Sequence, residues 1–264
     1  MVKLAANLSF LFKEKPFLDR FGAAAACGFR AVEFMFPGDG AYSHEAEEVA
    51  EKLNRKQTDN SKQTNITTAT ATLTTITTAN KQKIRCVHTA LLYARVMNCS
   101  KVHVMAGLRQ HGASEDVFVE RVRWASELAA EQGLTICIEP LNCRDFPGYL
   151  VPDTKTALDL IQRIDRPQSC KLQLDLYHLQ ISEGDLSENI RRLLPFAAHV
   201  QLANPPGRNE PGHGEVNFPS LLALLDDLGY DGHVGLEYNP SSTTLQSLEW
   251  ARSHGIFTPS SDVE

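Results

Sequence analysis

The sequence contains no hydrophobic run of about 18 residues or more, so no segment is long enough to span a membrane as a helix. It also has no excess of positive charge: 32 Asp and Glu residues stand against 26 Lys and Arg residues, and the net charge of −6 argues against a nucleic-acid partner. No Cys-x-x-Cys pair occurs among the six cysteines, which argues against zinc ribbons and dithiol redox motifs. The N-terminal residues lack a small-residue cleavage site and resemble a first strand. We therefore expect a cytoplasmic protein in a reducing compartment.

What the sequence does contain is a regular alternation of short apolar runs and longer amphipathic segments. The expected strands cover residues 4–7, 31–36, 101–107, 134–138, 171–175, 198–202 and 233–237. The expected helices cover residues 17–27, 43–53, 84–97, 114–132, 153–164, 186–194, 218–228 and 244–253, with Ser114 and Asp153 as N-caps. Strands separated by helices indicate parallel βαβ units, and eight of these in about 250 residues are typical of a (β/α)8 TIM barrel. A doubly wound sheet is the alternative, but the first turn lacks its Gly-x-Gly-x-x-Gly motif.

One stretch, residues 57–83, departs from this pattern. Residues 64–78 contain nine threonines, and their large apolar residues are Ile66, Leu73 and Ile76. Because threonine is β-branched, residues 66–76 could form a weak third strand, but the composition fits a low-complexity disordered insertion equally well. We therefore expect one barrel domain over residues 1–258, with an irregular or degraded third βα unit and a flexible tail over residues 259–264.

Four of the later expected strands end in a polar residue at the C-terminal tip: Glu139, Asp175, Gln201 and Glu237. One carboxylate after a strand is usually a solvated loop residue, but four successive tips would meet at the active-site face of a barrel. Three carboxylates and an amide oxygen suit Mg²⁺ or Mn²⁺, so we predict that these four side chains bind a divalent metal. Glu139 and Glu237 are also the expected catalytic pair. One removes a proton beside a carbonyl that the metal polarises, and the other protonates the neighbouring carbon.

Further side chains are expected near the same face. His178 should lie on a loop above the metal and orient the substrate; the alternative is a loop histidine with structural partners. Arg208, in a Gly/Pro-rich loop, is the expected clamp for a substrate carboxylate, with surface charge as the alternative. His103 alternates with apolar residues, which favours a barrel-lining position from which it would contact substrate rather than metal. Glu33 is expected to point into the barrel mouth.

The sequence resembles the hydroxypyruvate isomerases of the xylose isomerase-like barrel superfamily over nearly its whole length except residues 55–83. The matching segments are 5–9 (AANLS), 28–37 (GFRAVEFMFP), 102–107 (VHVMAG), 138–142 (IEPLN), 173–178 (QLDLYH), 199–203 (HVQLA), 207–211 (GRNEP), 214–219 (GEVNFP) and 235–240 (GLEYNP). In the family, residues 55–83 would correspond to a strand that ends in an Asn-Thr-Pro-Pro-Gly-Asp-like turn, and the Thr-rich stretch stands in its place.

The resemblance implies an isomerase that interconverts hydroxypyruvate and 2-hydroxy-3-oxopropanoate, with Glu139 and Glu237 as the proton donor and acceptor. It also implies metal binding by the four strand tips. With Gln201 at this strand tip the chain resembles the hydroxypyruvate isomerases. The sugar epimerases of the superfamily usually have His at the same position. The expected partner is a small hydroxy-keto acid, with no nucleic acid and no membrane, and homo-oligomerisation stays open. Two alternatives remain: a related ketose or keto-acid isomerase or epimerase, and an inactive paralogue that has lost function through residues 57–83.

Overall fold

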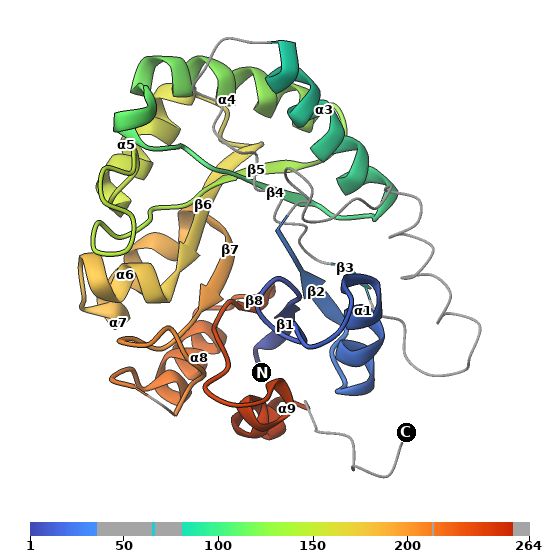
Figure 1. The fold of residues 1–264 in the computed structure, drawn as a ribbon. Coiled ribbons are helices and arrows are strands. Elements are labelled where there is room, and N and C mark those ends of the chain that lie inside the picture. Colours follow the sequence, from blue (N-terminus) through green and yellow to red (C-terminus); the bar gives the residue numbers. More distant parts are fainter. Residues whose placement is uncertain (36–64, 67–80, 213, 256–264) are drawn as a thin grey trace.

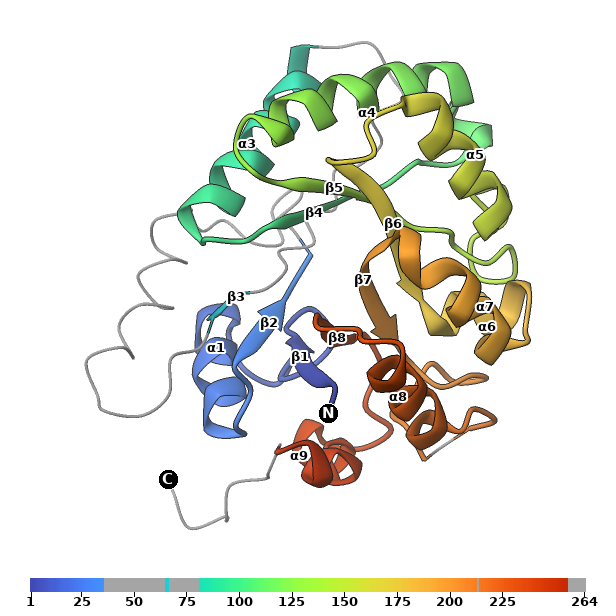
Figure 2. The same ribbon diagram turned by 180° about the vertical axis from the view of Figure 1, so that it is seen from behind.

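Eight parallel strands form one curved sheet, and the helices lie around its outer side (Figures 1 and 2). The structure is a computed structural model that describes residues 1–35, 65–66, 81–212 and 214–255. The order of the strands is β3-β2-β1-β8-β7-β6-β5-β4, as in a (β/α)8 barrel. The strands are β1 (Lys3–Asn7), β2 (Ala31–Glu33), β3 (Asn65–Ile66), β4 (Lys101–Val104), β5 (Thr135–Ile138), β6 (Cys170–Asp175), β7 (Ala197–Leu202) and β8 (His233–Leu236).

Helices alternate with the strands and cover the outer face of the sheet. Those described are α1 (Phe17–Ala26), α3 (Lys81–Val96), α4 (Glu115–Ala130), α5 (Thr154–Ile164), α6 (Leu176–Ser182), α7 (Leu186–Leu193), α8 (Phe218–Asp227) and α9 (Thr244–Ser247), with 3-10 turns η2 (Arg109–His111), η3 (Leu194–Phe196) and η4 (Glu249–His254). None of the described helices combines the length and the apolar character needed to cross a membrane.

Most expected elements are present within a few residues of their predicted bounds, but two differ. Residues 176–182, expected as a loop, form helix α6, because the Asp175 carboxylate accepts a hydrogen bond from the Tyr177 backbone N–H and caps a helix directly after β6. The last expected helix is a single α-helical turn, α9, followed by the 3-10 turn η4. The buried apolar side chains of this segment, Leu248 and Ala251, are three residues apart, which matches the 3-10 period. The expected helix 43–53 lies outside the described residues.

Of the third βα unit the structure describes strand β3 and helix α3, and the irregularity predicted for residues 57–83 concerns residues that lie mostly outside the described ranges. Strand β3 has two residues and pairs in parallel with β2, Ala31 with Asn65 and Val32 with Ile66. Within the described ranges no pairing joins β3 to β4, so the seam of the barrel lies between them. The remainder of the expected strand over residues 66–76 and the expected tail over residues 259–264 lie outside the described residues. The chain has the predicted (β/α)8 barrel fold.

Alternation along the strands separates two faces of the sheet. On β6, Leu172 and Leu174 belong to the hydrophobic core, whereas Gln173 and Asp175 are buried among other polar side chains. This is the period of two that a strand imposes, and in a barrel the second face is the interior. The barrel interior is therefore polar toward its C-terminal mouth.

Candidate active site

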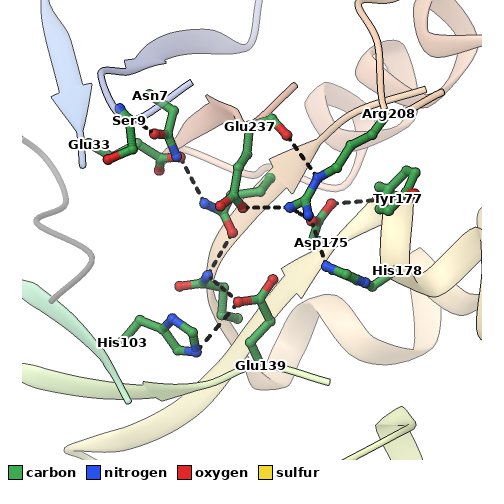
Figure 3. Close-up of polar contacts among 12 residues, drawn as sticks. Asn7, Ser9, Glu33, His103, Glu139, Asp175, Tyr177, His178, Arg208 and Glu237 are labelled. Carbon is green, nitrogen blue, oxygen red and sulfur yellow. Dashed lines mark hydrogen bonds and ion pairs between the residues drawn. The ribbon is translucent and has the colours of Figure 1, made fainter. Parts of the chain in front are cut away.

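Seven of the strands bring buried polar side chains into the barrel interior. They are Asn7 on β1, Glu33 on β2, His103 on β4, Glu139 after β5, Gln173 and Asp175 on β6, His199 and Gln201 on β7, and Glu237 after β8. Each is at most 5% exposed. All four predicted strand tips are among them, and Figure 3 shows the side chains of Glu139, Asp175 and Glu237 turned toward one another. The structure thus gathers at one mouth four strand-tip groups that lie up to 98 residues apart in sequence, from Glu139 to Glu237.

Glu139 lies beside two groups that can donate to it. Its Oε2 accepts a hydrogen bond from Gln173 Nε2 at 3.0 Å and lies 3.4 Å from His103 Nε2 (Figure 3). The same Gln173 nitrogen donates to Gln201 Oε1 at 2.6 Å. Gln173 therefore joins two of the predicted ligand residues, and His103 lines the barrel next to Glu139 as expected.

Arg208 lies between the other two carboxylates. Its Nη2 is 3.5 Å from Asp175 Oδ2 and 3.4 Å from Glu237 Oε2 (Figure 3). The guanidinium also lies over the rings of Phe10 and Tyr177, 5.1 and 5.0 Å from their centroids. The side chain is 16% exposed, so the alternative of a solvated surface charge is wrong.

His178 lies in the first turn of α6 rather than on a loop, which corrects the expectation for this residue. Its ring is buried, with Nε2 3.7 Å from Asp175 Oδ2 and Nδ1 bonded to Asn142. Because Asp175 caps α6, the Asp-x-x-His spacing puts the imidazole one helical turn beyond the carboxylate, on the same side.

A second set of hydrogen-bonded polar side chains is centred on Glu33 and comes from strands β1, β2 and β7. Glu33 Oε1 accepts hydrogen bonds from Asn7 Nδ2 and Gln201 Nε2, both at 2.8 Å, and Oε2 lies 2.5 Å from His199 Nε2. A Cβ on Gly235 would come within 2.3–2.5 Å of this carboxylate, so only glycine leaves room for it. With Glu33 holding its nitrogen, the amide of Gln201 turns its oxygen toward Gln173.

The pKa values of Glu139, Asp175 and Glu237 are raised above those of free carboxyl groups. Burial, followed by the charges of Glu237 and Asp175, raises the pKa of Glu139 well above its usual value. Burial raises the pKa of Asp175 to about 6 and that of Glu237 to about 8, and the charge of Arg208 opposes both shifts. Burial lowers the pKa of His103 to about 3, with His199 adding to the effect, and that of His178 to about 3, with Arg208 adding to it.

The residues present fit a divalent cation. Within the described residues, Glu139 Oε1 and Asp175 Oδ2 are buried without a hydrogen-bond partner, and Arg208, which lies beside Asp175 and Glu237, supplies one positive charge against the three carboxyl groups of Glu139, Asp175 and Glu237. Buried unpaired carboxylates are costly, and a divalent cation would neutralise them. Ligand atoms of Glu139, Asp175 and His178 lie within 4.8 Å of one another, a grouping able to hold a metal ion.

Several residues of the site were not predicted from the sequence. Gln173, His199 and Asn142 lie in segments that matched the family, but no role was assigned to them. The signal was available in the alternation of β6 and β7, since Gln173 and Asp175, like His199 and Gln201, are two residues apart and must share a face. Tyr177 and Phe10, which hold Arg208, had no comparable signal.

The fold and the site together define a barrel enzyme with carboxylates at its strand tips and a place for a cation. The sequence profile of the xylose isomerase-like TIM barrel family matches residues 21–254. The chain belongs to this family, and it is an isomerase.

Several known proteins resemble the chain over nearly the whole length of both sequences. A 2-oxo-tetronate isomerase of Pectobacterium atrosepticum is 38% identical over 259 residues, which are 95% of this chain and 97% of that protein. The hydroxypyruvate isomerase of Escherichia coli is 34% identical, over 95% of this chain and 98% of its own. A solved structure from Brucella melitensis, described as an AP endonuclease of family 2, is 36% identical with a TM-score of 0.87, covering 96% of this chain and 99% of that chain.

Proposed function

We propose that this isomerase interconverts hydroxypyruvate and 2-hydroxy-3-oxopropanoate with the help of Mg²⁺ or Mn²⁺. The observation that supports this most directly is the meeting of Glu139, Asp175 and Glu237 around Arg208 in a buried barrel mouth. The Escherichia coli relative named hydroxypyruvate isomerase supports the choice of substrate. The residues proposed to hold the cation are Glu139, Asp175, Gln201 and Glu237.

Glu139 and Glu237 are the proposed proton carriers. In the forward direction one carboxylate accepts a proton from C3 of hydroxypyruvate, and the other carboxyl group donates a proton to C2, while the proton of the C3 hydroxyl ends on the C2 oxygen. Burial raises the pKa of both carboxyl groups, which brings the donor and acceptor forms closer in energy near neutral pH. A bound divalent cation supplies polarisation of the substrate carbonyl.

Arg208, His178 and His103 are the proposed substrate contacts. Arg208 offers a planar set of donors for the substrate carboxylate, and the rings of Phe10 and Tyr177 hold the guanidinium in place. His178 and His103 are buried, and their lowered pKa values keep both rings neutral at pH 7, so they can act as hydrogen-bonding groups without adding charge.

A four-carbon 2-oxo acid is the second candidate substrate, because the Pectobacterium atrosepticum relative is named a 2-oxo-tetronate isomerase. Both candidates carry a carboxylate beside the reacting carbonyl, so the same contacts serve either. A kcat/KM panel with hydroxypyruvate, 2-oxo-tetronate and uncharged ketoses separates them. Preference for the three-carbon acid supports the proposal, preference for the four-carbon acid selects the second candidate, and preference for free ketoses contradicts both.

The test begins with protein stripped of metal by EDTA. Conversion of hydroxypyruvate is followed by ¹H NMR with no metal, Mg²⁺ or Mn²⁺, and thermal melts are recorded under the same conditions. The proposal expects turnover only with added metal. It also expects stabilisation of about 2.7 kcal/mol when the free metal is at 100 times its Kd. Asp175→Asn should abolish the metal-dependent stabilisation. A folded protein that neither turns over nor responds to metal would instead be the inactive paralogue.

A further inference from the structure

The His178 ring has one nitrogen fixed by Asn142. The Nδ1 atom of His178 lies 3.2 Å from the backbone nitrogen of Asn142 and 2.7 Å from its side-chain Nδ2. A backbone N–H can only donate, so Nδ1 must accept and cannot carry a proton. In a neutral imidazole the proton is then on Nε2.

The direction of the Asn142 amide is fixed in the same way. Its Oδ1 accepts a hydrogen bond from the backbone N–H of Asp145 at 2.9 Å, again a group that can only donate. The amide nitrogen must therefore point the other way, where it lies 3.1 Å from Asp145 Oδ2 and 2.7 Å from His178 Nδ1. Two backbone N–H groups thus determine the donors and acceptors of the whole group, and turning the amide over would break three hydrogen bonds.

Packing holds the ring in this orientation. The imidazole is 2% exposed and lies between the rings of Phe146 and Tyr177, with centroids 5.8 and 5.2 Å away. Its Nε2 points into the site (Figure 3) and lies 3.7 Å from Asp175 Oδ2, which is too long for a hydrogen bond. Among the described residues Nε2 has no hydrogen-bond partner, so its N–H is available to a bound molecule.

We propose that Asn142 is a positioning residue that sets His178 as the Nε2–H tautomer, so that the ring donates to an oxygen of the substrate and does not bind the cation. Metal binding needs a lone pair on the nitrogen that faces the site, and this tautomer has none there. The inference deepens the proposed function. It selects the four strand-tip residues as ligands over the grouping of Glu139, Asp175 and His178, although all three lie close enough to share an ion.

The test reads the tautomer directly. In metal-free protein with ¹⁵N-labelled histidine, long-range ¹H–¹⁵N spectra distinguish protonated from unprotonated ring nitrogens, and His178→Gln identifies the His178 signals. The expected result is an unprotonated Nδ1 and a protonated Nε2, with the Nε2 proton retained after saturation with Mg²⁺ or Zn²⁺. A protonated Nδ1 in the wild type, or loss of the Nε2 proton when either metal is added, overturns the proposal.

Asn142→Asp supplies the perturbation, because a carboxylate beside Nδ1 favours a proton there. The variant should protonate Nδ1 and raise KM for hydroxypyruvate by about tenfold or more, which corresponds to the loss of one hydrogen bond of about 1.4 kcal/mol. An unchanged Nδ1 contradicts the role of Asn142. If Asn142→Asp does not fold, Asn142→Ala, which keeps the backbone donor, should retain the wild-type tautomer, and a protonated Nδ1 in that variant would contradict the argument from the backbone N–H.

Tyr177→Phe is the matched control for the spectrum. It removes a hydroxyl that bonds to Asp145 and leaves the ring contact with His178, so the tautomer should not change. Because the spectra need neither substrate nor turnover, failure of the proposed function and failure of this inference are separate results. An inactive wild type with Nε2–H on His178 contradicts the former alone.

Discussion

The two glutamates at the site have different neighbours although they share one proposed task. Glu139 lies beside the neutral groups Gln173 and His103, whereas Glu237 lies beside the charge of Arg208. A neighbouring cation favours the ionised form of a carboxyl group. In the free protein Glu237 is therefore the more readily ionised of the two, and Glu139 the one that more readily keeps its proton.

Replacement of either glutamate should remove proton transfer. Glu139→Gln and Glu237→Gln keep the size of the side chain but cannot exchange protons, so each should lower kcat on the proposed substrate by roughly 10²- to 10⁴-fold. Glu188→Gln is the control, because that carboxylate is 72% exposed on α7, and it should leave kcat unchanged. Near-normal kcat in either site variant would show that the residue is not a proton carrier.

Gly235 is a residue-scale constraint on the site that can be measured as stability. In Gly235→Ala the new methyl group meets the Glu33 carboxylate, and this overpacking should lower the free energy of unfolding by about 1–3 kcal/mol in urea denaturation. The double variant Gly235→Ala/Glu33→Ala should be more stable than the sum of the single effects predicts, since the second change removes the clash. Additive effects would mean that the two positions do not interact.

The site residues that the sequence predicted share one simple rule. Glu139, Asp175 and Glu237 follow apolar strands directly, so their position at the barrel mouth depends only on the fold class. The face that Gln173 occupies follows from the alternation of β6, but the roles of Gln173 and Asn142 could not be predicted, because they depend on which atoms of other segments these side chains contact. Strand register and helix position decide such contacts, and neither is visible in a single sequence.

At the scale of secondary-structure elements, the N-termini of helices α4 and α5 can be compared directly. Asp153 and Ser114 were both expected as N-caps, but only the side chain of Asp153 accepts a cap hydrogen bond, from the Thr156 backbone N–H at 2.7 Å. Asp153→Ala should therefore cost about 0.5–2 kcal/mol of stability in urea denaturation, and Ser114→Ala less than about 0.5 kcal/mol. Equal losses would contradict the difference between the two caps.

Long periodic elements were predictable, and short or unusual ones were not. Helices α4 and α5 have clear apolar stripes and were predicted within two residues of their bounds. Helix α6 has seven residues and depends on a cap that is also a site residue, so its sequence suggested a loop. For the third unit, composition indicated irregularity, which stays a prediction because most of residues 57–83 lie outside the described ranges.

At the scale of the whole molecule, the half-buried His233 links stability to pH. Burial, with the charges of Lys3, Lys101 and His199, lowers the pKa of His233 from 6.5 to about 4. Between these values the unfolded chain binds a proton at this residue and the folded protein does not, so this contribution to stability is present above pH 6.5 and is lost as the pH falls toward 4.

His233→Gln should therefore flatten the loss of stability on acidification. Urea unfolding of metal-free protein at several pH values between 4.5 and 7.5 gives the slope for each protein. Subtracting the slope of the variant from that of the wild type gives the contribution of His233 alone. The site carboxyl groups contribute to both slopes, and their raised pKa values make the protein more stable as the pH falls, which is the opposite effect. Parallel curves would show that His233 titrates alike in both states.

Strands β1 and β8 are neighbours in the sheet, paired from Lys3 with His233 to Ala6 with Leu236. The ribosome therefore synthesises β1 long before β8, the strand with which β1 must pair. Glu237 directly follows β8 in the sequence. A nascent chain whose β8 is still inside the ribosome therefore lacks the strand that lies between β1 and β7, and it also lacks one of the two proposed proton carriers. Assembly of the catalytic mouth therefore has to wait until residues 233–237 have left the ribosome.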